Sequence, residues 1–236
     1  MKIELRLNKK PKLRRHDYPG KLIVFEGTDG AGKTTLINMT REYLAEIVGR
    51  DNVVVTKTPT DMSRNTKLFQ KMMYCKCHED IDSRAVQLLT MSDRVQHIFE
   101  EIEPALRAGK NVICDRYIYT SLANMLARGY MKEDWFFMAA KHLIMPDIVF
   151  LAHVEPALAI ERIKSRPEEA RRHLDEELLK KVSANFVGMS RSSGFVVLDT
   201  SKEAENAFKI IKAFLWNRVI DSLIDTRLQR KAVVNE

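Results

Sequence analysis

The chain has 236 residues, of which 45% are hydrophobic and 30% are charged, a mix that fits one α/β domain and is short for two. Its formal net charge of +7 suits an anionic ligand, although charge alone does not separate nucleotides from nucleic acid or a membrane surface. Three cysteines are too few for a disulfide framework, and no apolar run reaches the roughly 18 residues of a membrane span. We therefore expect no membrane contact and a cytoplasmic protein.

The first 20 residues form a basic arm, which we separate from a domain of residues 21–236. Lysines and arginines cluster in the arm, and residues 1–7 alternate apolar with polar side chains, which predicts an edge strand. The arm lacks the apolar stretch of a signal peptide. A solvated arm is the simplest interpretation, and a transit peptide or a contact with nucleic acid or another protein are the alternatives. Nucleic acid is not among the partners that we expect.

Short apolar runs alternate with longer amphipathic segments through the rest of the chain. Strands are predicted at residues 22–25, 52–56, 111–114, 148–152 and 195–198. Helices are predicted at residues 34–48, 83–108, 156–165 and 204–228, with two more between residues 119 and 143. Strands that alternate with helices pair in parallel, so we expect an α/β fold with a five-stranded parallel sheet and helices on both faces.

A glycine-rich segment, GTDGAGKT, lies at residues 27–34 between the first predicted strand and the first predicted helix. It fits the pattern G-x-x-x-x-G-K-[ST] in the strand–loop–helix context of a phosphate-binding loop. Glycines let the backbone wrap around an anion, and the N-terminus of the helix attracts its charge. Lys33 is then expected at the β- and γ-phosphates of ATP, and Thr34 at Mg²⁺. The predicted ATP-binding residues are Gly27, Asp29, Gly30, Ala31, Gly32, Lys33, Thr34, Thr35 and Arg162.

Asp115 and Arg116 follow directly after the predicted strand at residues 111–114. Ligands of parallel sheets bind at the carboxyl ends of the strands, so both side chains are expected beside the glycine-rich loop. Asp115 can hold Mg²⁺ together with Thr34, and Arg116 can clamp an acceptor phosphate bidentately. The alternative is an aspartate that caps the next helix and an arginine on the surface.

Residues 162–175 form a basic stretch that we predict to be a lid. A mobile cationic lid would stabilise the phosphoryl group during transfer and exclude water. A solvated helix end with Glu–Arg pairs is the alternative. The cations of the stretch are Arg162, Lys164, Arg166, Arg171 and Arg172.

The absence of an N-K-x-D sequence counts against a GTPase and leaves a hydroxyl or a phosphate as the acceptor. A hydroxyl needs a base, yet the segment after the second predicted strand reads Lys57-Thr58-Pro59 and holds no acid. A phosphate needs none, because its second pKa of about 6 leaves it largely dianionic at neutral pH. The missing base favours a phosphate acceptor, and Asp61, which lies nearby, keeps a hydroxyl acceptor open.

Four segments together resemble the thymidylate kinase family over about residues 21–215. They are FEGTDGAGKTTL at residues 25–36, LLTMSDRVQH at 88–97, IEPALRAGKNVICDRYIYTSLA at 102–123 and PDIVFLAHVEPALAIERIKSR at 146–166. The resemblance implies the fold of P-loop nucleoside monophosphate kinases. It also implies transfer of the γ-phosphate of Mg·ATP to dTMP, which becomes dTDP. It also implies a homodimer packed through helices, for which residues 83–108 are the candidate.

The resemblance assigns roles to individual residues. Asp29 resembles the acid that meets the acceptor sugar or its metal–water network, and Arg94 the arginine that reads the base edge. Gly30 stands where one subtype has arginine, which implies that the lid carries the catalytic arginine, here Arg166. The implied catalytic residues are Lys33, Asp115, Arg116 and Arg166. The implied acceptor-binding residues are Asp29, Thr58, Thr90, Arg94, Arg116, Ser121 and Asn124.

Three of these positions depart from the family pattern. Thr90 replaces an aromatic residue that stacks on thymine, and Asn124 replaces a tyrosine that blocks a 2′-hydroxyl. Thr58 replaces an acid or an aromatic residue. A kinase for a ribonucleotide or a modified nucleotide is therefore the alternative to a thymidylate kinase, and a nucleotide-binding module with a partner-binding arm is a further one.

Overall fold

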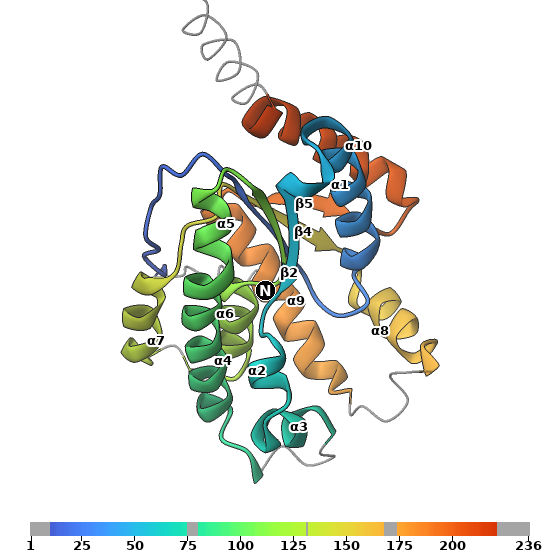
Figure 1. Ribbon diagram of the computed structural model, residues 1–236. Coiled ribbons are helices and arrows are strands. Elements are labelled where there is room, and N and C mark those ends of the chain that lie inside the picture. The colour runs from blue at the N-terminus through green and yellow to red at the C-terminus, as the bar shows by residue number, and fades with distance from the viewer. Residues whose placement is uncertain (1–9, 75–79, 131, 168–173, 221–236) are drawn as a thin grey trace, which may run out of the picture.

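Five parallel strands form the centre of the molecule in the computed structural model, which describes residues 10–74, 80–130, 132–167 and 174–220 (Figure 1). The sheet order is β2-β3-β1-β4-β5, so the strand that leads into the glycine-rich loop lies in the middle. All five residues of β1, LIVFE, are buried, as expected of a strand covered on both faces. The strands are β1 Leu22–Glu26, β2 Val53–Lys57, β3 Asn111–Asp115, β4 Ile148–His153 and β5 Val196–Asp199. The predicted fold class is confirmed.

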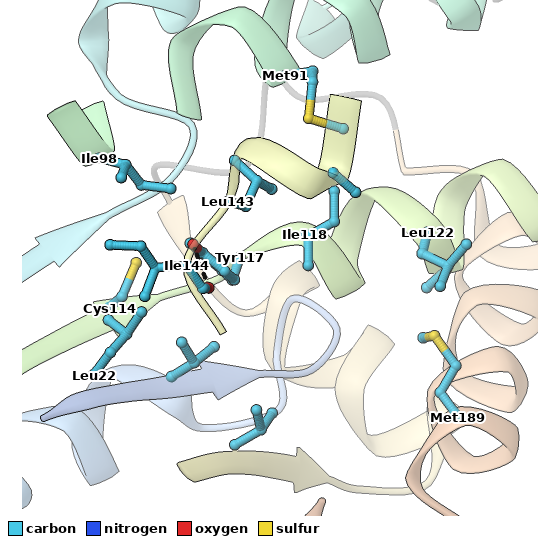
Figure 2. Close-up of a cluster of buried hydrophobic side chains, with 14 of the residues drawn as sticks. Leu22, Met91, Ile98, Cys114, Tyr117, Ile118, Leu122, Leu143, Ile144 and Met189 are labelled. Carbon is cyan, nitrogen blue, oxygen red and sulfur yellow. Dashed lines mark hydrogen bonds between the residues drawn. The ribbon is translucent and has the colours of Figure 1, made fainter. Parts of the chain in front are cut away.

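Helices cover both faces of the sheet. One face carries α4 Ser83–His97, α5 Glu103–Arg107, α6 Ile118–Ala127, α7 Asp134–Ala139 and α9 Glu176–Ser193. The other carries α1 Lys33–Val48, α8 Pro156–Lys164 and α10 Ala204–Leu215. Alternate residues of β1 point into the two cores: Leu22 and Val24 into the first, Ile23 and Phe25 into the second. Figure 2 shows part of the first core around Tyr117 and Leu122.

The predicted helix at residues 83–108 is one helical segment with an interruption. Between α4 and α5 the chain passes through a π-helical turn, η3 Ile98–Ile102, which adds a residue to the turn and shifts the buried face. Phe99, within this turn, is 73% exposed, whereas Ile98 and Ile102 are buried. Of the predicted closing helix, α10 and η6 Trp216–Ile220 are described, and residues 221–228 lie outside the described residues.

Among the described residues, three α-helices were not predicted: α9 and the short pair α2 Asp61–Arg64 and α3 Lys67–Tyr74. The charged start of α9 concealed an apolar face that buries Leu179, Val182, Phe186 and Met189 at helical spacing. Because α9 packs against α6, it closes one side of the site described below.

Residues 10–20 lie against the domain rather than away from it, while residues 1–9, with most of the predicted edge strand, lie outside the described residues. The boundary at residue 20 stays a prediction. Within the described residues, none of the helices combines the length and the apolar character needed to cross a bilayer.

Candidate active site

The loop between β1 and α1 depends on glycine at two positions for steric reasons. Gly27 and Gly30 have φ angles of 139° and 76°, a region that side chains disfavour. A Cβ at Gly27 would lie 2.4 Å from the carbonyl oxygen of Ala152, and one at Gly30 would lie 2.3 Å from that of Ala159. The loop is therefore wedged between β4 and α8, with its backbone close enough to both to leave no space for a methyl group.

Lys33, the first residue of α1, points back over this loop. Its Nζ donates to the carbonyl oxygens of Gly27, at 3.2 Å, and Thr28, at 2.8 Å. Burial, helped by the positive charge of Arg116, lowers the pKa of Lys33 to about 8. The next residues, Thr34 and Thr35, are exposed at the start of the helix. The structure thus brings the predicted phosphate-binding residues together around one loop.

This lowered pKa predicts how activity depends on pH. A lysine is charged below its pKa, so the cation that attracts ATP is lost as pH rises through about 8. We expect kcat/KM for ATP to fall through that range, because this ratio reports the ionisation of groups in the free enzyme. In Lys33→Arg the residual activity should stay flat, because a guanidinium does not deprotonate there. A wild-type profile that stays flat to pH 10 would contradict this assignment.

Asp115 ends β3 beside both neighbouring strands, in register with Phe25 of β1 and Lys57 of β2. Its Oδ1 is buried and has no hydrogen-bond partner in the described part of the chain. A carboxylate oxygen without a partner and the hydroxyl of Thr34 are the donor types that Mg²⁺ prefers when nucleotide phosphates complete its shell. The residues present therefore fit a nucleotide-bound Mg²⁺. The described residues contain no cluster of three or more metal-ligating side chains that would hold a metal alone.

Arg116 directly follows Asp115 and has an unusual backbone conformation, a φ angle of 65° for a residue with a side chain. Its Nη1 donates to the carbonyl oxygen of Gly27, at 2.9 Å, and to Oγ1 of Thr120, at 3.2 Å. Its Nη2 forms an ion pair with Asp29. Arg116, the predicted clamp, is thus paired with Asp29, the predicted sugar-binding acid. An acceptor phosphate that binds Arg116 would have to share its guanidinium with Asp29 or displace the Asp29 carboxylate.

Glu26, which the sequence did not single out, stabilises the segment that follows Arg116. It is fully buried, and burial raises its pKa, while Thr120 and Arg116 oppose the rise. Its carboxylate accepts from the backbone N–H groups of Tyr117, at 2.9 Å, and Thr120, at 3.2 Å. The side chain thus caps α6 and fixes the Thr120 hydroxyl, to which Arg116 donates.

A cavity of about 240 Å³ opens beside Arg116, between α3, α4, α6 and α9. Six of the predicted acceptor-binding residues line it: Asp29, Thr90, Arg94, Arg116, Ser121 and Asn124. The seventh, Thr58, lies behind the wall and is 1% exposed. Its hydroxyl donates to the carbonyl oxygen of Arg116, at 2.8 Å, and accepts from Nε of Arg94, at 3.3 Å. Thr58 therefore links two arginines rather than facing the cavity.

Two further arginines line the same cavity. Arg64, from α2, donates from Nε to the carbonyl oxygen of Pro59, at 2.7 Å, and lies over the ring of Phe69 at 5.7 Å. Burial and the charge of Arg116 lower the pKa of Arg64. Arg128 closes the other end, where its Nη1 donates to Oδ1 of Asn124 at 2.9 Å. An arginine on an unpredicted helix gave no sequence signal, although Thr60 before α2 has the character of an N-cap.

A second cavity of about 300 Å³ lies on the other side of the loop. Gly30, Gly32, Thr35, Arg162 and Arg166 line it, all of them predicted, together with Thr200 and Lys202, which were not. Arg162 is held by the carbonyl oxygen of Thr200, at 3.0 Å from its Nη2. Residues 168–173 of the predicted lid, with Arg171 and Arg172, lie outside the described residues.

The chain is similar to several known proteins. The thymidylate kinase family matches residues 25–211. A probable thymidylate kinase of Thermococcus kodakarensis is 37% identical over 174 residues, 71% of this chain and 83% of that protein. The thymidylate kinase of Limosilactobacillus reuteri is 30% identical over 210 residues, 86% of this chain and 98% of that protein. The crystal structure of thymidylate kinase from Ehrlichia chaffeensis has a TM-score of 0.64 and 25% identity, covering 83% of this chain and 98% of that one. This chain therefore belongs to the thymidylate kinase family and is an ATP-dependent phosphotransferase of the nucleoside monophosphate kinase class.

Proposed function

We propose that the protein transfers the γ-phosphate of Mg·ATP to a deoxynucleoside monophosphate, with dTMP converted to dTDP as the main reaction. One observation carries the proposal: the glycine-rich loop contributes to both cavities. Thr28 and Asp29 line the cavity between α4 and α9, whereas Gly30 and Gly32 line the other. ATP in the second cavity would place its γ-phosphate at the loop, next to an acceptor phosphate in the first.

The side chains around the loop suit a transfer between two anions. Lys33 holds the β- and γ-phosphates, and Arg116 and Arg94 neutralise and orient the acceptor. Arg166 approaches from the donor side as the lid residue. Thr34 and Asp115 would hold Mg²⁺, which when bound would neutralise charge on the phosphates. Positioning and electrostatic stabilisation account for most of the rate enhancement in phosphoryl transfer. The site therefore needs cations around the phosphates more than it needs a general base.

The acceptor cavity supports a phosphate acceptor for a second reason. Four arginines line it, Arg64, Arg94, Arg116 and Arg128, while Asp29, the carboxylate of the loop itself, is already paired with Arg116. A monophosphate is largely dianionic at neutral pH and needs no base to attack. The charge of the cavity is thus complementary to the group that the reaction has to bind.

A coupled assay of ADP release over the common deoxy- and ribonucleoside monophosphates tests the proposal. We expect dTMP to give the highest kcat/KM, and no turnover with any of them would refute it. Thr90 and Asn124 favour the alternative, a ribonucleotide or modified acceptor, because both line the cavity where the family pattern has aromatic residues. A ribonucleotide that outcompetes dTMP by about tenfold, or roughly 1.4 kcal/mol, would establish that alternative.

We also propose a homodimer that forms through α4 and η3. Leu88, Val95 and Phe99 are 53%, 36% and 73% exposed and lie two turns and then about one turn apart, so they form an apolar stripe. A second copy of the same helix offers a matching stripe, and the two together would remove this surface from water. The stripe lies on the opposite side of α4 from buried Thr90 and Arg94, so a dimer leaves the acceptor cavity open.

The substitution Phe99→Asp tests this interface. A charge within an apolar contact is costly to bury, so the variant should become monomeric at micromolar concentration in sedimentation equilibrium. Met138→Asp is the control, because Met138 is 62% exposed on α7, away from the stripe, and the variant should remain dimeric. A wild-type protein that sediments as a monomer at every concentration would refute the dimer.

A cytoplasmic location is proposed from the use of cysteine. Three cysteines are too few for a framework of disulfides of the kind found in secreted domains. Cys114 is free and buried in β3, and burial raises the pKa of its thiol, which keeps it unreactive.

A further inference from the structure

We propose that residues 10–20, named here the strap, position Arg116 by bracing Ile144, whose carbonyl oxygen anchors Tyr117. The strap precedes residues 25–211, the part that matches the family. The inference rests on the proposed role of Arg116 as the acceptor-phosphate clamp. It makes the strap part of the catalytic machinery at a distance, without contact to either substrate.

The strap grips the backbone on both sides of Ile144. The N–H group of Arg14 donates to the carbonyl oxygen of Leu143, at 2.8 Å, and the N–H group of Met145 donates to the carbonyl oxygen of Arg14, at 2.8 Å. Together these bonds form a parallel bridge between Arg14 and Ile144. The segment of residues 143–145 lies between the short helix η4 Ala140–His142 and strand β4, outside both elements. The strap therefore supplies the ladder hydrogen bonds that this segment lacks on its own.

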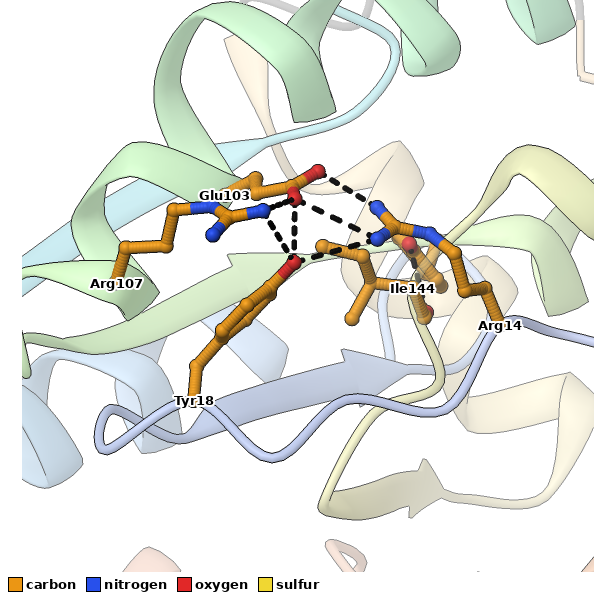
Figure 3. Close-up of polar contacts among 6 residues, drawn as sticks. Arg14, Tyr18, Glu103, Arg107 and Ile144 are labelled. Atoms are coloured by element: carbon orange, nitrogen blue, oxygen red, sulfur yellow. Dashed lines mark hydrogen bonds and ion pairs between the residues drawn. The ribbon is translucent and has the colours of Figure 1, made fainter.

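A cluster of four side chains, named here the latch, holds the strap against α5 (Figure 3). Glu103 accepts from Arg14, at 2.6 Å, from Arg107, at 2.7 Å, and from the hydroxyl of Tyr18. The guanidinium of Arg107 also lies over the Tyr18 ring at 4.5 Å. The hydrogen bonds from Arg14 and Tyr18 lower the pKa of Glu103 to about 2, so the latch stays charged at neutral pH. Arg14 thus joins the latch with its side chain and Ile144 with its backbone.

Ile144 in turn reaches the active site through Tyr117. The buried hydroxyl of Tyr117 donates to the carbonyl oxygen of Ile144 at 2.9 Å, the contact drawn as a dashed line in Figure 2. Tyr117 follows Arg116, whose φ angle of 65° is disfavoured for a residue with a side chain. Such a conformation persists only where its surroundings fix it on both sides.

Four contacts hold the backbone on either side of Arg116, besides the weak hydrogen bond that its carbonyl oxygen accepts from Sγ of Cys114 at 3.1 Å. Its N–H group donates to the carbonyl oxygen of Phe25, at 2.8 Å, and its own carbonyl oxygen accepts from Thr58. On the far side, Glu26 holds the N–H group of Tyr117, and Ile144 holds its hydroxyl. The first three contacts come from residues at the carboxyl ends of strands. The fourth comes from the segment that the strap braces, so it is the one that the strap can loosen.

Two variants interrupt this connection at different points. Arg14→Ala combined with Tyr18→Phe opens the latch, and Tyr117→Phe removes the hydroxyl that reaches Ile144. Each should lower kcat/KM for the acceptor about 5- to 10-fold and leave KM for ATP within about twofold, because Lys33 and the loop are untouched. Both variants together should be no worse than Tyr117→Phe alone, because they break one connection, and such non-additivity is the signature of coupling. Arg41→Ala is the control, since it removes an exposed ion pair with Glu42 on α1 and should have no effect.

Hydrogen exchange of the peptide spanning residues 114–121 gives a readout that does not require turnover. In the full chain, opening the latch should speed exchange of this peptide, with no change in peptides from α1. Wild-type kinetics and exchange in the latch variant, even with a lower melting temperature, would overturn the inference, as would strictly additive kinetic effects. A wild-type protein without kinase activity would instead refute the proposed function, and the exchange experiment would still decide whether the strap supports Arg116.

Discussion

Lys33→Ala is expected to lower kcat by two to three orders of magnitude while leaving the fold nearly unchanged. Lys33 is the only lysine of the glycine-rich loop, and its ammonium group lies 2.8–3.2 Å from two loop carbonyl oxygens, poised over the place where the phosphates would bind. Removing a preorganised charge of this kind costs roughly 10²- to 10³-fold in kcat, or about 3–4 kcal/mol of the barrier. The unfolding free energy should change little, because a buried cation is costly to keep in the free protein.

Lys33→Met is the matched control for this experiment. It keeps the length and apolar stem of the side chain but removes the charge, so it should be as inactive as the alanine variant and fold at least as stably as wild type. Steady-state ADP release and thermal melts by circular dichroism measure the two properties. Turnover near the wild-type rate in either variant would show that the loop is not the active site.

The second large effect is expected at Arg116, where alanine and glycine should be compared. Both substitutions remove the guanidinium, so both should lower kcat/KM for the acceptor by about 10²- to 10³-fold while ATP binding changes little. They should differ in stability. At a φ angle of 65° a Cβ is disfavoured, so Arg116→Gly should be more stable than Arg116→Ala by about 1 kcal/mol.

This pair separates the chemical role of Arg116 from its backbone strain. Isothermal titration with ATP, acceptor kinetics and urea denaturation give the three quantities. Equal stability of the two variants would mean that the backbone relaxes at this position. An acceptor KM and kcat near wild type in both would mean that Arg116 is not the clamp.

The sheet and the glycine-rich loop could be predicted because their signals are local. The first predicted strand, residues 22–25, is a continuous apolar run, and the loop at residues 27–34 carries its motif in consecutive positions. The carboxyl-end rule then placed Asp115 and Arg116 beside the loop, and the register of β1 with β3 confirms this position. Resemblance to a family supplied the acceptor residues on α4 and α6, which no local pattern identifies.

What could not be predicted depends on contacts between distant segments. Arg64 enters the acceptor cavity only because buried Asp93 of α4 accepts from the N–H groups of Thr60 and Ser63 and so fixes the start of α2. Thr58 was expected at the acceptor and instead lies behind the cavity wall. In each case the side chain's direction is set by a tertiary hydrogen bond, which neither periodicity nor spacing encodes.

The close fit of Gly30 against α8 also limits how this enzyme could evolve. The resemblance to the family implies a subtype with an arginine at this position of the loop, and a single codon change would place one there. Here the carbonyl oxygen of Ala159 lies 2.3 Å from where the first side-chain atom would be. The helix that leads into the lid would have to move outward before the loop could accept any side chain. A substitution of Gly30 alone is therefore strained, and an engineer who wants an arginine in the loop has to redesign α8 first.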